Sequence, residues 1–488
     1  MYQPLLISKY LRRKLAPLFA ALAVTLCTMM VIIVMSVMGG FLDMMRSAAQ
    51  RLTGDVTIMA DFRGFAHYEE LMADLRQLPE VAAVTAVIRT GGMATFEDPG
   101  FGDRVHLVEV VGIDGPSFDA VLGYAETLYW TAEDVKQRFD LDEGPDLRAH
   151  GLALTTPGVW RLPEGTAAAV AGIEVNPYNR RDERGRYALP GSAVGQLVSI
   201  SVPPVTAGGS FTEPRTAKFA VVNEFKSGLY DIDSQRIYVP FAVLQKVMRM
   251  DAAEAVDLDT GEPTGRTIPA RASEVMVRGA AGVPLAELDR RVRGVARHFH
   301  ERHSGVVPYL GTQTWEQRHA VLLGAVANEK GLITFLFAII GLVSVVMVAT
   351  TFYMIVLEKT RDIGVLRAIG ASRVGVAGIF LGYGLAVGVV GALLGLVAGV
   401  AIVTHLNEIQ EVLYQVTLWW NQSVLGNDLG GWRMWNPQTY YFDRIPDHVN
   451  PAEAAWVVAF AMTSSVLGAV IPAALAARLD PVVSLRYE

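Results

Sequence analysis

The sequence has little cysteine, little charge and no dense cluster of basic residues. Cys27 is the single cysteine among 488 residues, so the chain has no disulfide framework and no cysteine-rich metal site. Charged residues make up 19% of the chain, below the roughly 25% of ordinary soluble domains, which argues against a purely cytosolic protein. The formal charge of −7 gives no reason to expect nucleic acid as a partner.

The sequence also lacks the motifs of common catalytic sites. Phosphate-binding loops follow the pattern GxxxxGK[ST], whereas the nearest segment, Gly261–Thr267, has the wrong spacing and an arginine in place of the lysine. His298, His300 and His303 lie close together, but residues two apart on a helix do not share a face, and the HExxH order is absent. We therefore expect a solvent-facing helix surface there, and no metal, cofactor or catalytic residue in this chain.

Long apolar stretches are what the sequence does contain. Hydrophobic residues make up 51% of the chain, and the mean hydropathy is +0.31. A membrane-spanning helix needs about 20 mostly apolar residues, and four stretches qualify: Ala16–Gly40, Leu332–Leu357, Val374–Val403 and Ala452–Ala477. The first is longer than the core of a signal peptide and has no small-residue cleavage site near its end, so we expect an uncleaved anchor.

Lysine and arginine predict how these spans are oriented, because short segments rich in both stay on the cytoplasmic side. The tail before the first span and the loop between the second and third spans carry four such residues each, whereas the longer connection Thr404–Pro451 has only Arg433 and Arg444. We expect both termini and residues 358–373 in the cytoplasm. The other two connections then lie outside.

The first external connection, Phe41–Gly331, has 291 residues and is long enough for one large domain or two small ones. β-branched runs alternate with helical stretches in it, which predicts an α+β domain. We expect strands at Val81–Ile88, Val105–Val111, Gln196–Val202 and Lys218–Val222, and helices at Tyr68–Leu78, Pro240–Met250 and Leu285–His303. The turn-rich run Asp251–Arg271 predicts an exposed turn or loop.

The third span is rich in glycine at a spacing that lets helix backbones approach closely in a membrane. The glycines are Gly378, Gly382, Gly384, Gly388, Gly391, Gly395 and Gly399. Tight packing within a four-helix bundle is the favoured interpretation, and a dimer face is the alternative.

The loop between the second and third spans has the character of a short amphipathic helix. Ile363, Leu366 and Ile369 follow a helical spacing, charged residues flank them, and Gly370 suits a helix C-terminus. Such a helix could lie on the bilayer surface or dock in the groove of a partner. The residues alone leave both interpretations open.

Residues Glu358–Ser372, EKTRDIGVLRAIGAS, resemble the signature of FtsX/MacB-type ABC permeases. Further segments resemble the lipoprotein-releasing permeases of the LolC/LolE type within that superfamily. They are Val37–Phe41 (VMGGF against the family's VMNGF), Trp315–Gln317 followed by Asn328–Lys330, Phe225–Asp231, Ile237–Pro240, Tyr440–Pro446, Pro472–Pro481 and the C-terminal Leu485–Glu488. The resemblance implies an α-helical membrane protein with four transmembrane helices and a large α+β extracytoplasmic domain, the MacB-like periplasmic core, between the first two.

The resemblance and the apolar stretches together divide the chain into segments. We expect a cytoplasmic tail at 1–15, a first span at 16–40, the MacB-like domain at 41–331, a second span at 332–357, a cytoplasmic coupling helix at 358–373, a third span at 374–403, an external loop at 404–451, a fourth span at 452–477 and a cytoplasmic tail at 478–488. Residues 332–488 then form the FtsX-like permease domain. The implied location is the bacterial inner membrane, with the large domain in the periplasm.

The family resemblance also implies partners. It implies a homo- or heterodimer of permease subunits and a separate cytoplasmic ATPase that binds ATP and Mg²⁺, so that this chain is not itself an enzyme. In the family, ATP-driven closure on the cytoplasmic side lifts a lipid-anchored protein from the membrane and passes it to a soluble carrier. By this resemblance the ATPase-coupling residues are Glu358, Arg361, Asp362, Leu366, Arg367 and Gly370.

A carrier-recruiting β-hairpin is a further expectation from the resemblance to LolC-type subunits. The corresponding segment is Pro203–Arg215, between the strands expected at Gln196–Val202 and Thr216–Val222. Proline and glycine in it suit a protruding hairpin, and an exposed Phe211 is the natural anchor for a partner. The residues singled out are Pro203, Pro204, Phe211, Pro214 and Arg215. An ordinary long hairpin is the alternative.

The chain departs from the family between about Ser117 and Leu189, where it is longer and carries an acidic stretch, Glu133–Asp146, and an arginine-rich stretch, Asn179–Arg186. This departure keeps two alternatives open besides lipoprotein extraction. One is a MacB-like permease that exports a peptide or toxin. The other is an FtsX-like regulator of a cell-wall hydrolase.

Overall fold

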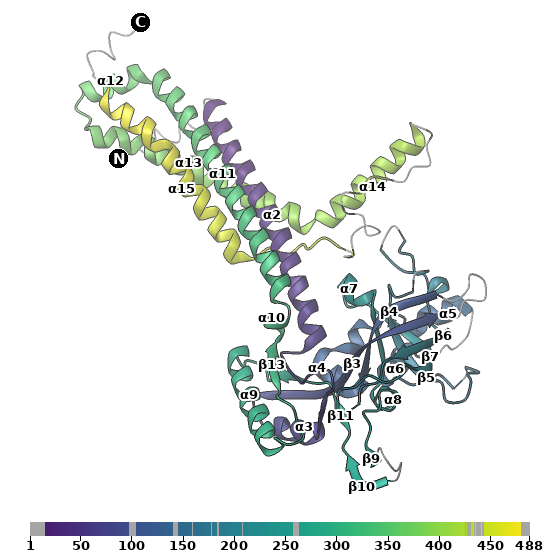
Figure 1. Cartoon of the computed structure of the whole chain (residues 1–488). Helices are drawn as coiled ribbons and strands as arrows, with labels where there is room; N and C mark the ends of the chain where they lie inside the picture. Colours follow the sequence, from purple (N-terminus) through teal and green to yellow (C-terminus); the bar gives the residue numbers. More distant parts are fainter. Residues whose placement is uncertain are drawn as a thin grey trace. The chain divides into compact units, whose positions relative to one another are not determined.

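A computed structural model describes residues 15–479 except 97–103, 140–144, 159, 177, 183–184, 207, 257–262, 425, 427–430, 434, 436–440 and 442–443. The chain divides into two units (Figure 1). We call them the helical unit, made of Met1–Met44, Gly324–Trp435 and Arg444–Glu488, and the sheet unit, made of Met45–Leu323 and Asn436–Asp443. The expected cytoplasmic tails fall almost wholly outside the described residues.

Four helices of the described chain are long and apolar enough to cross a membrane. They are α2 (Leu15–Thr53), α11 (Ala320–Glu358), α13 (Arg373–Thr404) and α15 (Pro451–Arg478). α2 and α11 have 39 residues each, well beyond the roughly 20 that a bilayer needs. Each therefore continues past the apolar stretch that the sequence predicts, and its far end belongs to the sheet unit.

Glycine lets α13 pack closely against two neighbouring helices. A Cβ atom at Gly391 or Gly395 would lie 2.8 Å or 2.6 Å from the Cβ atom of Val24 or Thr28 on α2. On another side of α13, a Cβ atom at Gly384 would lie 2.6 Å from the Cβ atom of Ala469 on α15. These three glycines are therefore required by packing within this chain, in agreement with the favoured interpretation of the glycine spacing.

The described residues of the helical unit also form two shorter helices. α12 (Thr360–Ala368) lies between α11 and α13, and α14 (Leu406–Ser423) follows α13. Residues 404–451 are expected as an external loop without a helix, although Leu406, Ile409, Leu413 and Val416 follow a helical spacing. Side-chain caps mark where helices begin: Ser372 accepts a hydrogen bond from the Gly375 N–H (3.0 Å) at the start of α13, and Asn450 accepts one from the Ala452 N–H (3.0 Å) before α15.

The sheet unit has α+β structure. Its main sheet has nine strands in the order β13-β1-β12-β3-β4-β8-β5-β7-β6, and β3 also pairs with β6. The strands of this sheet are β1 (Val56–Met59), β3 (Val81–Phe96), β4 (Arg104–Ile113), β5 (Ala167–Gly172), β6 (Leu197–Val202), β7 (Arg215–Phe225), β8 (Arg236–Pro240), β12 (Glu274–Gly279) and β13 (Gly311–Thr314). The helices of the unit are α3 (Tyr68–Arg76), α4 (Gly115–Leu122), α5 (Ala132–Phe139), α6 (Leu147–Ala153), α7 (Tyr230–Asp233), α8 (Phe241–Val247), α9 (Leu285–Arg302) and α10 (Trp315–Arg318).

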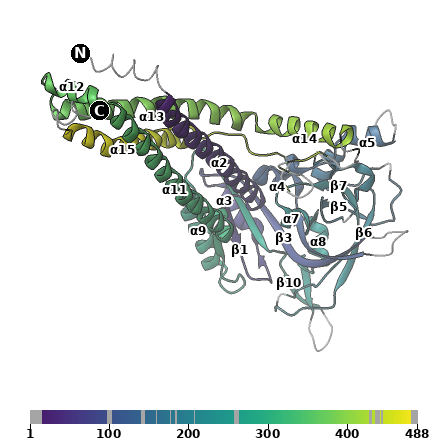
Figure 2. The same ribbon diagram turned by 90° about the horizontal axis from the view of Figure 1, so that it is seen from above.

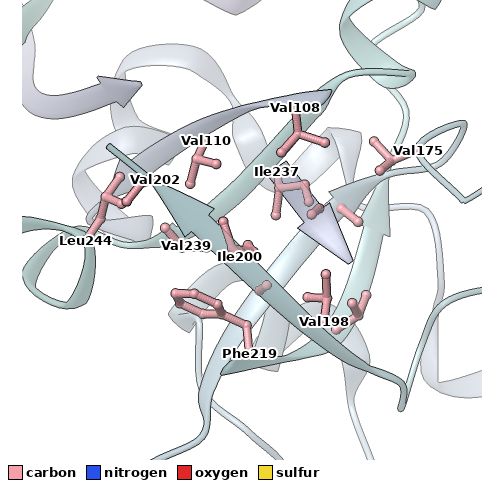
Figure 3. Close-up of a cluster of buried hydrophobic side chains, with 14 of the residues drawn as sticks. Val108, Val110, Val175, Val198, Ile200, Val202, Phe219, Ile237, Val239 and Leu244 are labelled. Carbon is pink, nitrogen blue, oxygen red and sulfur yellow. The ribbon is translucent and has the colours of Figure 1, made fainter. Parts of the chain in front are cut away.

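The long strand β3 belongs to both halves of this sheet. Its first half pairs with β12, and residues Ile88–Phe96 pair with β4. Residues Met93–Phe96 pair with β6 as well, which closes β3, β4, β8, β5, β7 and β6 into a ring. A closed ring of strands leaves no free sheet edge there. Alternation along β6 sends Val198, Ile200 and Val202 into the interior (Figure 3).

The other half of the sheet, β13-β1-β12-β3, is covered by helices. α9 presents Leu288, Val292, Ala296 and Phe299 at helical spacing to a core shared with α3 and β1, and α4 packs in a separate core with Met276 and Val87. Each of the four expected strands lies within or one residue beyond an observed one. The expected helices are also present, within a few residues at their ends.

The expectation of an exposed turn or loop over the whole of Asp251–Arg271 is wrong in part. Strands β9 (Ala253–Val256) and β10 (Pro263–Ile268) form an antiparallel hairpin, which extends away from the rest of the sheet unit (Figure 2). Its turn, 257–262, lies outside the described residues. Strand β10 includes Pro263 and Gly265, with a register shift between Pro263 and Thr267, so residues on both sides of the turn form strands instead of a loop. A further short pair joins β2 (Phe65–Ala66) to β11 (Arg271–Ala272).

Candidate functional site

The candidate carrier segment, Pro203–Arg215, folds as a hairpin between β6 and β7. The Thr206 N–H donates to the Ser210 carbonyl (3.0 Å), and the Thr212 N–H donates to the Pro204 carbonyl (3.0 Å). Gly209 has φ 88°, a left-handed conformation that glycine adopts without strain. The sequence therefore encodes a closed turn rather than an irregular loop.

Phe211 projects from this hairpin. Its side chain is 66% exposed and stacks on Phe62, which is 63% exposed, with ring centroids 5.8 Å apart and planes 11° apart. Two exposed aromatic rings in contact form an apolar surface of the kind that anchors protein interfaces. Phe62 is not predicted from the sequence, since a lone phenylalanine in a short turn carries no periodic signal.

A buried arginine fastens the hairpin to the sheet unit. Arg271 of β11 is 6% exposed and donates through its guanidinium to the carbonyl oxygens of Arg63 (2.8 Å), Val205 (3.0 Å) and Arg249 (3.1 Å). It therefore joins the base of the hairpin to the turn that carries Phe62. Burial lowers the pKa of Arg271, and the charge of Arg63 adds to this effect.

A groove of about 830 Å³ runs beside the two rings. Its apolar lining includes Met59, Phe62, Met93, Leu107, Pro203, Phe211, Pro214, Met248 and Met250. Of the five residues singled out in the hairpin, Pro203, Phe211 and Pro214 share this groove. Pro204 is buried, and Arg215 is exposed at the start of β7, where it pairs with Val202.

Ion pairs lie at one end of the groove. Arg89 is 2.6 Å from Glu109 and 3.3 Å from Glu274, and Arg236 is also 2.6 Å from Glu109. Burial alone would raise the pKa of Glu109, but the charges of Arg89 and Arg236 outweigh it and lower the pKa to about 2. Arg318 of α10 bonds Glu274 (3.0 Å) and so joins the residues before α11 to this network.

The candidate coupling segment contains α12 and the turn that follows it. Gly370 has φ 106°, and the Ala371 N–H donates to the Leu366 carbonyl (3.0 Å), which is how helices that end in a left-handed glycine are closed. Ile363 is buried in a cluster with Val356, Val376 and Phe380 of the flanking helices. The segment is therefore held against the helical unit by one side of α12.

The polar residues of this segment interact within the chain. Arg367 donates to the carbonyl oxygens of Ala477 (3.4 Å) and Leu479, where α15 ends. Asp362 lies 2.6 Å from Lys359. Glu358 ends α11 with an exposed side chain, Arg361 is exposed, and Leu366 is half-buried. The six residues singled out thus lie along one short segment but not on one exposed face.

Exposed aliphatic side chains are the other feature of the coupling segment. Ile369 is 80% exposed and Val374 is 83% exposed, with Val365 also exposed between the charged residues. Large exposed aliphatic side chains beside charged residues are typical of surfaces that a partner covers. Ile369 belongs to the stripe expected from the sequence, whereas Val374 is expected only as the first residue of the third span.

The histidines of α9 are arranged differently from one another. His298 faces solvent as expected. The expectation is wrong for His303, the residue that follows α9, because the end of α9 packs against α3. The His303 ring stacks on His67 with the centroids 4.8 Å apart and lies 3.0 Å from Glu70. Within the described part of the chain, no group of three or more His, Cys, Asp or Glu side chains could hold a metal ion.

Comparison with known protein families covers both candidate segments. A model of the MacB-like periplasmic core domain matches residues 18–295, more than half of the chain, and a model of the FtsX-like permease C-terminal region matches residues 334–481. The chain belongs to the FtsX/MacB permease family. The hairpin of this permease lies within the first match, and its coupling segment lies within the second. The permease is accordingly a membrane protein with a periplasmic domain, the sheet unit.

Curated relatives of this permease come from the lipoprotein-releasing systems of other bacteria. The chain is 26% identical over 298 residues to "Lipoprotein-releasing system transmembrane protein LolC" of Xylella fastidiosa (strain 9a5c), and 24% identical over 302 residues to the protein of that name in Neisseria meningitidis serogroup B. Each alignment covers 61% of this chain and 62% of the relative's length. A solved structure, the periplasmic region of MacB from Actinobacillus actinomycetemcomitans, matches 56% of this chain and 95% of that chain at 11% identity, with a TM-score of 0.28.

Proposed function

We propose that this permease is the membrane subunit of an ABC transporter that extracts lipoproteins from the inner membrane and passes them to a periplasmic carrier. The observation that carries the proposal is the hairpin with its exposed Phe211, in a chain whose curated relatives are lipoprotein-releasing proteins. A transporter that passes cargo to a soluble partner needs a surface to recruit that partner, and an exposed aromatic residue on a fixed turn supplies one.

The chemical energy comes from a separate ATPase subunit in this proposal. That subunit binds ATP and Mg²⁺ and docks on the coupling segment, so residues 358–373 and both termini lie in the cytoplasm. A second permease subunit, identical or related, completes the transporter. Closure of the ATPase moves the spanning helices, and α2 and α11 carry this movement toward the sheet unit, because α2 leads into β1 and β13 leads through α10 into α11.

Arg361 and Asp362 are the polar candidates for ATPase contact. Both are exposed on α12, and Asp362 is held by Lys359. Substitution of either residue by alanine should lower transport-coupled ATP turnover while the protein stays in the membrane. Unchanged coupling in both variants would remove them from the interface.

The test of the proposed function is purification of the full chain with its ATPase in nanodiscs. Mass spectrometry of the co-purified material should identify lipid-modified proteins. Addition of ATP and the soluble carrier should then move these proteins from the nanodisc fraction to the carrier fraction. Phe211→Ala should reduce the transfer, whereas Tyr309→Ala, at an exposed aromatic residue elsewhere on the sheet unit, should not.

Two other outcomes would contradict the proposal. Co-purification of an outer-membrane channel and export of an unlipidated peptide would indicate a MacB-like exporter. Activation of a cell-wall hydrolase without any transported cargo would indicate an FtsX-like regulator.

A further inference from the structure

Tyr441 joins the sheet unit from a distant part of the chain. The segment Asn436–Asp443 belongs to the sheet unit, although α14 before it and α15 after it belong to the helical unit. Tyr441 is the residue of this segment that the structure describes, and its side chain contacts the sheet unit. The position of its ring within the sheet unit therefore shows how Tyr441 is held.

Four side chains surround the ring of Tyr441, and we call them the Tyr441 site: Arg181, Lys226, Tyr230 and Asp233. The Tyr441 hydroxyl donates to the Asp233 carboxylate, 208 positions away in the sequence. The Arg181 guanidinium lies 4.9 Å from the ring centroid and the Lys226 ammonium 5.7 Å from it. Tyr230 meets the ring edge-on at 5.7 Å. Cations at these distances attract an aromatic face, and the edge-on contact is a favoured aromatic geometry.

Asp233 makes the site selective for a hydroxyl group. Its carboxylate is fully buried and accepts hydrogen bonds from the N–H groups of Ser227 (2.8 Å) and Gly228 (3.2 Å). A buried carboxylate is costly unless donors surround it, and burial raises the pKa of Asp233 although these donors oppose the change. The Tyr441 hydroxyl supplies a further donor, which a phenylalanine at this position could not do.

The arginine-rich stretch Asn179–Arg186 finds a role here, through Arg181. Its guanidinium lies 3.3 Å from Glu174, and Glu174 accepts a hydrogen bond from the Tyr187 hydroxyl. The Glu174 carboxylate thus holds the Arg181 guanidinium in place over the Tyr441 ring. This stretch lies in the region 117–189, which is expected from the sequence to be longer than in the family, and Arg181 supplies one wall of the site.

We propose that the contacts of the Tyr441 site fasten the chain between α14 and α15 to the sheet unit. We call this fastened connection the strap. The sheet unit then has three connections to the spanning helices: α2 through β1, α11 through β13, and the strap. Movement of α13 and α15 reaches the sheet unit through the strap without passing along α2 or α11. The inference is independent of which cargo the permease moves.

Photo-cross-linking of the full chain in nanodiscs tests the contact while Tyr441 stays intact. The variant Tyr230→p-benzoylphenylalanine places the reactive group beside the Tyr441 ring. Trypsin cleaves after Arg433 and Arg444, so Tyr441 lies in the peptide 434–444. We expect illumination to join position 230 to this peptide within one chain. The matched control, Tyr309→p-benzoylphenylalanine, should not produce that product. Absence of the cross-link, or a cross-link only between two copies of the chain, would overturn the strap.

Hydrogen exchange tests whether the hydroxyl holds the strap closed. The variant Tyr441→Phe loses the hydrogen bond from the tyrosine hydroxyl to the Asp233 carboxylate, and hydrogen bonds to charged groups contribute strongly to stability. We therefore expect amide exchange in peptides containing Ser227 and Gly228 to become about ten- to a hundredfold faster. Tyr230→Phe keeps its ring contact and should leave this exchange unchanged. Equal exchange in Tyr441→Phe and the unaltered chain would overturn the proposal. Neither measurement requires cargo, carrier or ATP. The strap proposal can therefore fail or succeed separately from the proposed function.

Discussion

Each unit has one of the two candidate partner-binding segments, the coupling segment in the helical unit and the Pro203–Arg215 hairpin in the sheet unit, and an arginine helps to hold each segment in place. Arg367 bonds the carbonyl oxygens at the end of α15 from the coupling segment. Arg271 bonds three carbonyl oxygens around the base of the hairpin. Backbone carbonyls at helix ends and in loops lack partners within their own element, and a guanidinium can bond several of them at once.

The two arginines differ in how deeply they are buried, and the two segments differ in what they expose. Arg271 is almost fully buried, whereas Arg367 is half-buried at a helix end. The hairpin exposes an aromatic pair, and the coupling segment exposes aliphatic side chains. In both segments the conspicuous arginine holds the backbone in place. The apolar side chains are what a partner can cover.

The largest expected effect follows from replacing Arg271. Arg271→Lys keeps the charge but cannot reach three carbonyl oxygens at once, so the hairpin should detach from the turn that carries Phe62. We expect the free energy of unfolding of the sheet unit to fall by about 3 kcal/mol. Thermal unfolding of the full chain and proteolysis within the hairpin measure this.

Arg249→Lys is the control for Arg271→Lys, since Arg249 contributes its carbonyl rather than its side chain to this arrangement. It should leave both the unfolding and the proteolysis unchanged. A stable hairpin in Arg271→Lys would mean that the turn hydrogen bonds of the hairpin suffice to hold it.

The second effect concerns the apolar surface of the hairpin. Phe211→Ala removes the ring that projects furthest from the hairpin, while the backbone bonds of Arg271 remain. Truncation of an interface anchor costs about 2 kcal/mol or more, so binding of the carrier should weaken about 30-fold. Titration of the carrier against the purified permease measures the change.

Phe62→Ala separates direct contact from support in the hairpin. If the carrier covers both rings, this variant should weaken binding by a similar factor. If Phe62 only supports Phe211, the loss should be several-fold smaller. Equal binding by Phe211→Ala and the unaltered chain would reduce the segment to an ordinary long hairpin.

Sequence reasoning works well for the spanning helices and for strands with alternating residues. Uninterrupted apolar runs predict the spanning helices, and alternating patterns such as Leu197–Val202 predict the strands, because each of these signals depends on local sequence. Helix α14 and the strands β9 and β10 were harder to predict. Their sequences mix polar and apolar residues, and tertiary packing decides among the alternatives.

The candidate segments could be located from the sequence, but the roles of their residues could not. Arg367 has the appearance of an exposed charge in a cytoplasmic helix, and only the folded chain shows the end of α15 beside it. Phe62 and Phe211 are 149 positions apart, and Tyr441 and Asp233 are 208 apart. Contacts of this range leave no periodic pattern in a single sequence.

A smaller effect is expected at the coupling segment. Ile369→Ser removes an exposed aliphatic side chain at the end of α12 without disturbing the buried Ile363. If the ATPase covers this surface, its binding to the permease should weaken about tenfold, because the burial of one aliphatic side chain contributes about 1.5–3 kcal/mol at most. Co-purification of the ATPase at graded salt concentrations measures this. Leu393→Ser, at an exposed position in the middle of α13, should not weaken that binding.

The smallest expected effect is at Arg367, and it decides between contact and support. Arg367→Met keeps the apolar part of the side chain but removes the donors to Ala477 and Leu479. A partly exposed arginine at a helix C-terminus contributes about 1 kcal/mol, so the thermal stability of the helical unit should fall slightly. If Arg367 acts as a support, Arg367→Lys should restore both stability and ATPase coupling, because an ammonium group can also bond a helix end. If Arg367 touches the ATPase through a bidentate contact, Arg367→Lys should restore stability but not coupling. The ratio of ATP hydrolysed to cargo released, measured for both variants, separates the two cases.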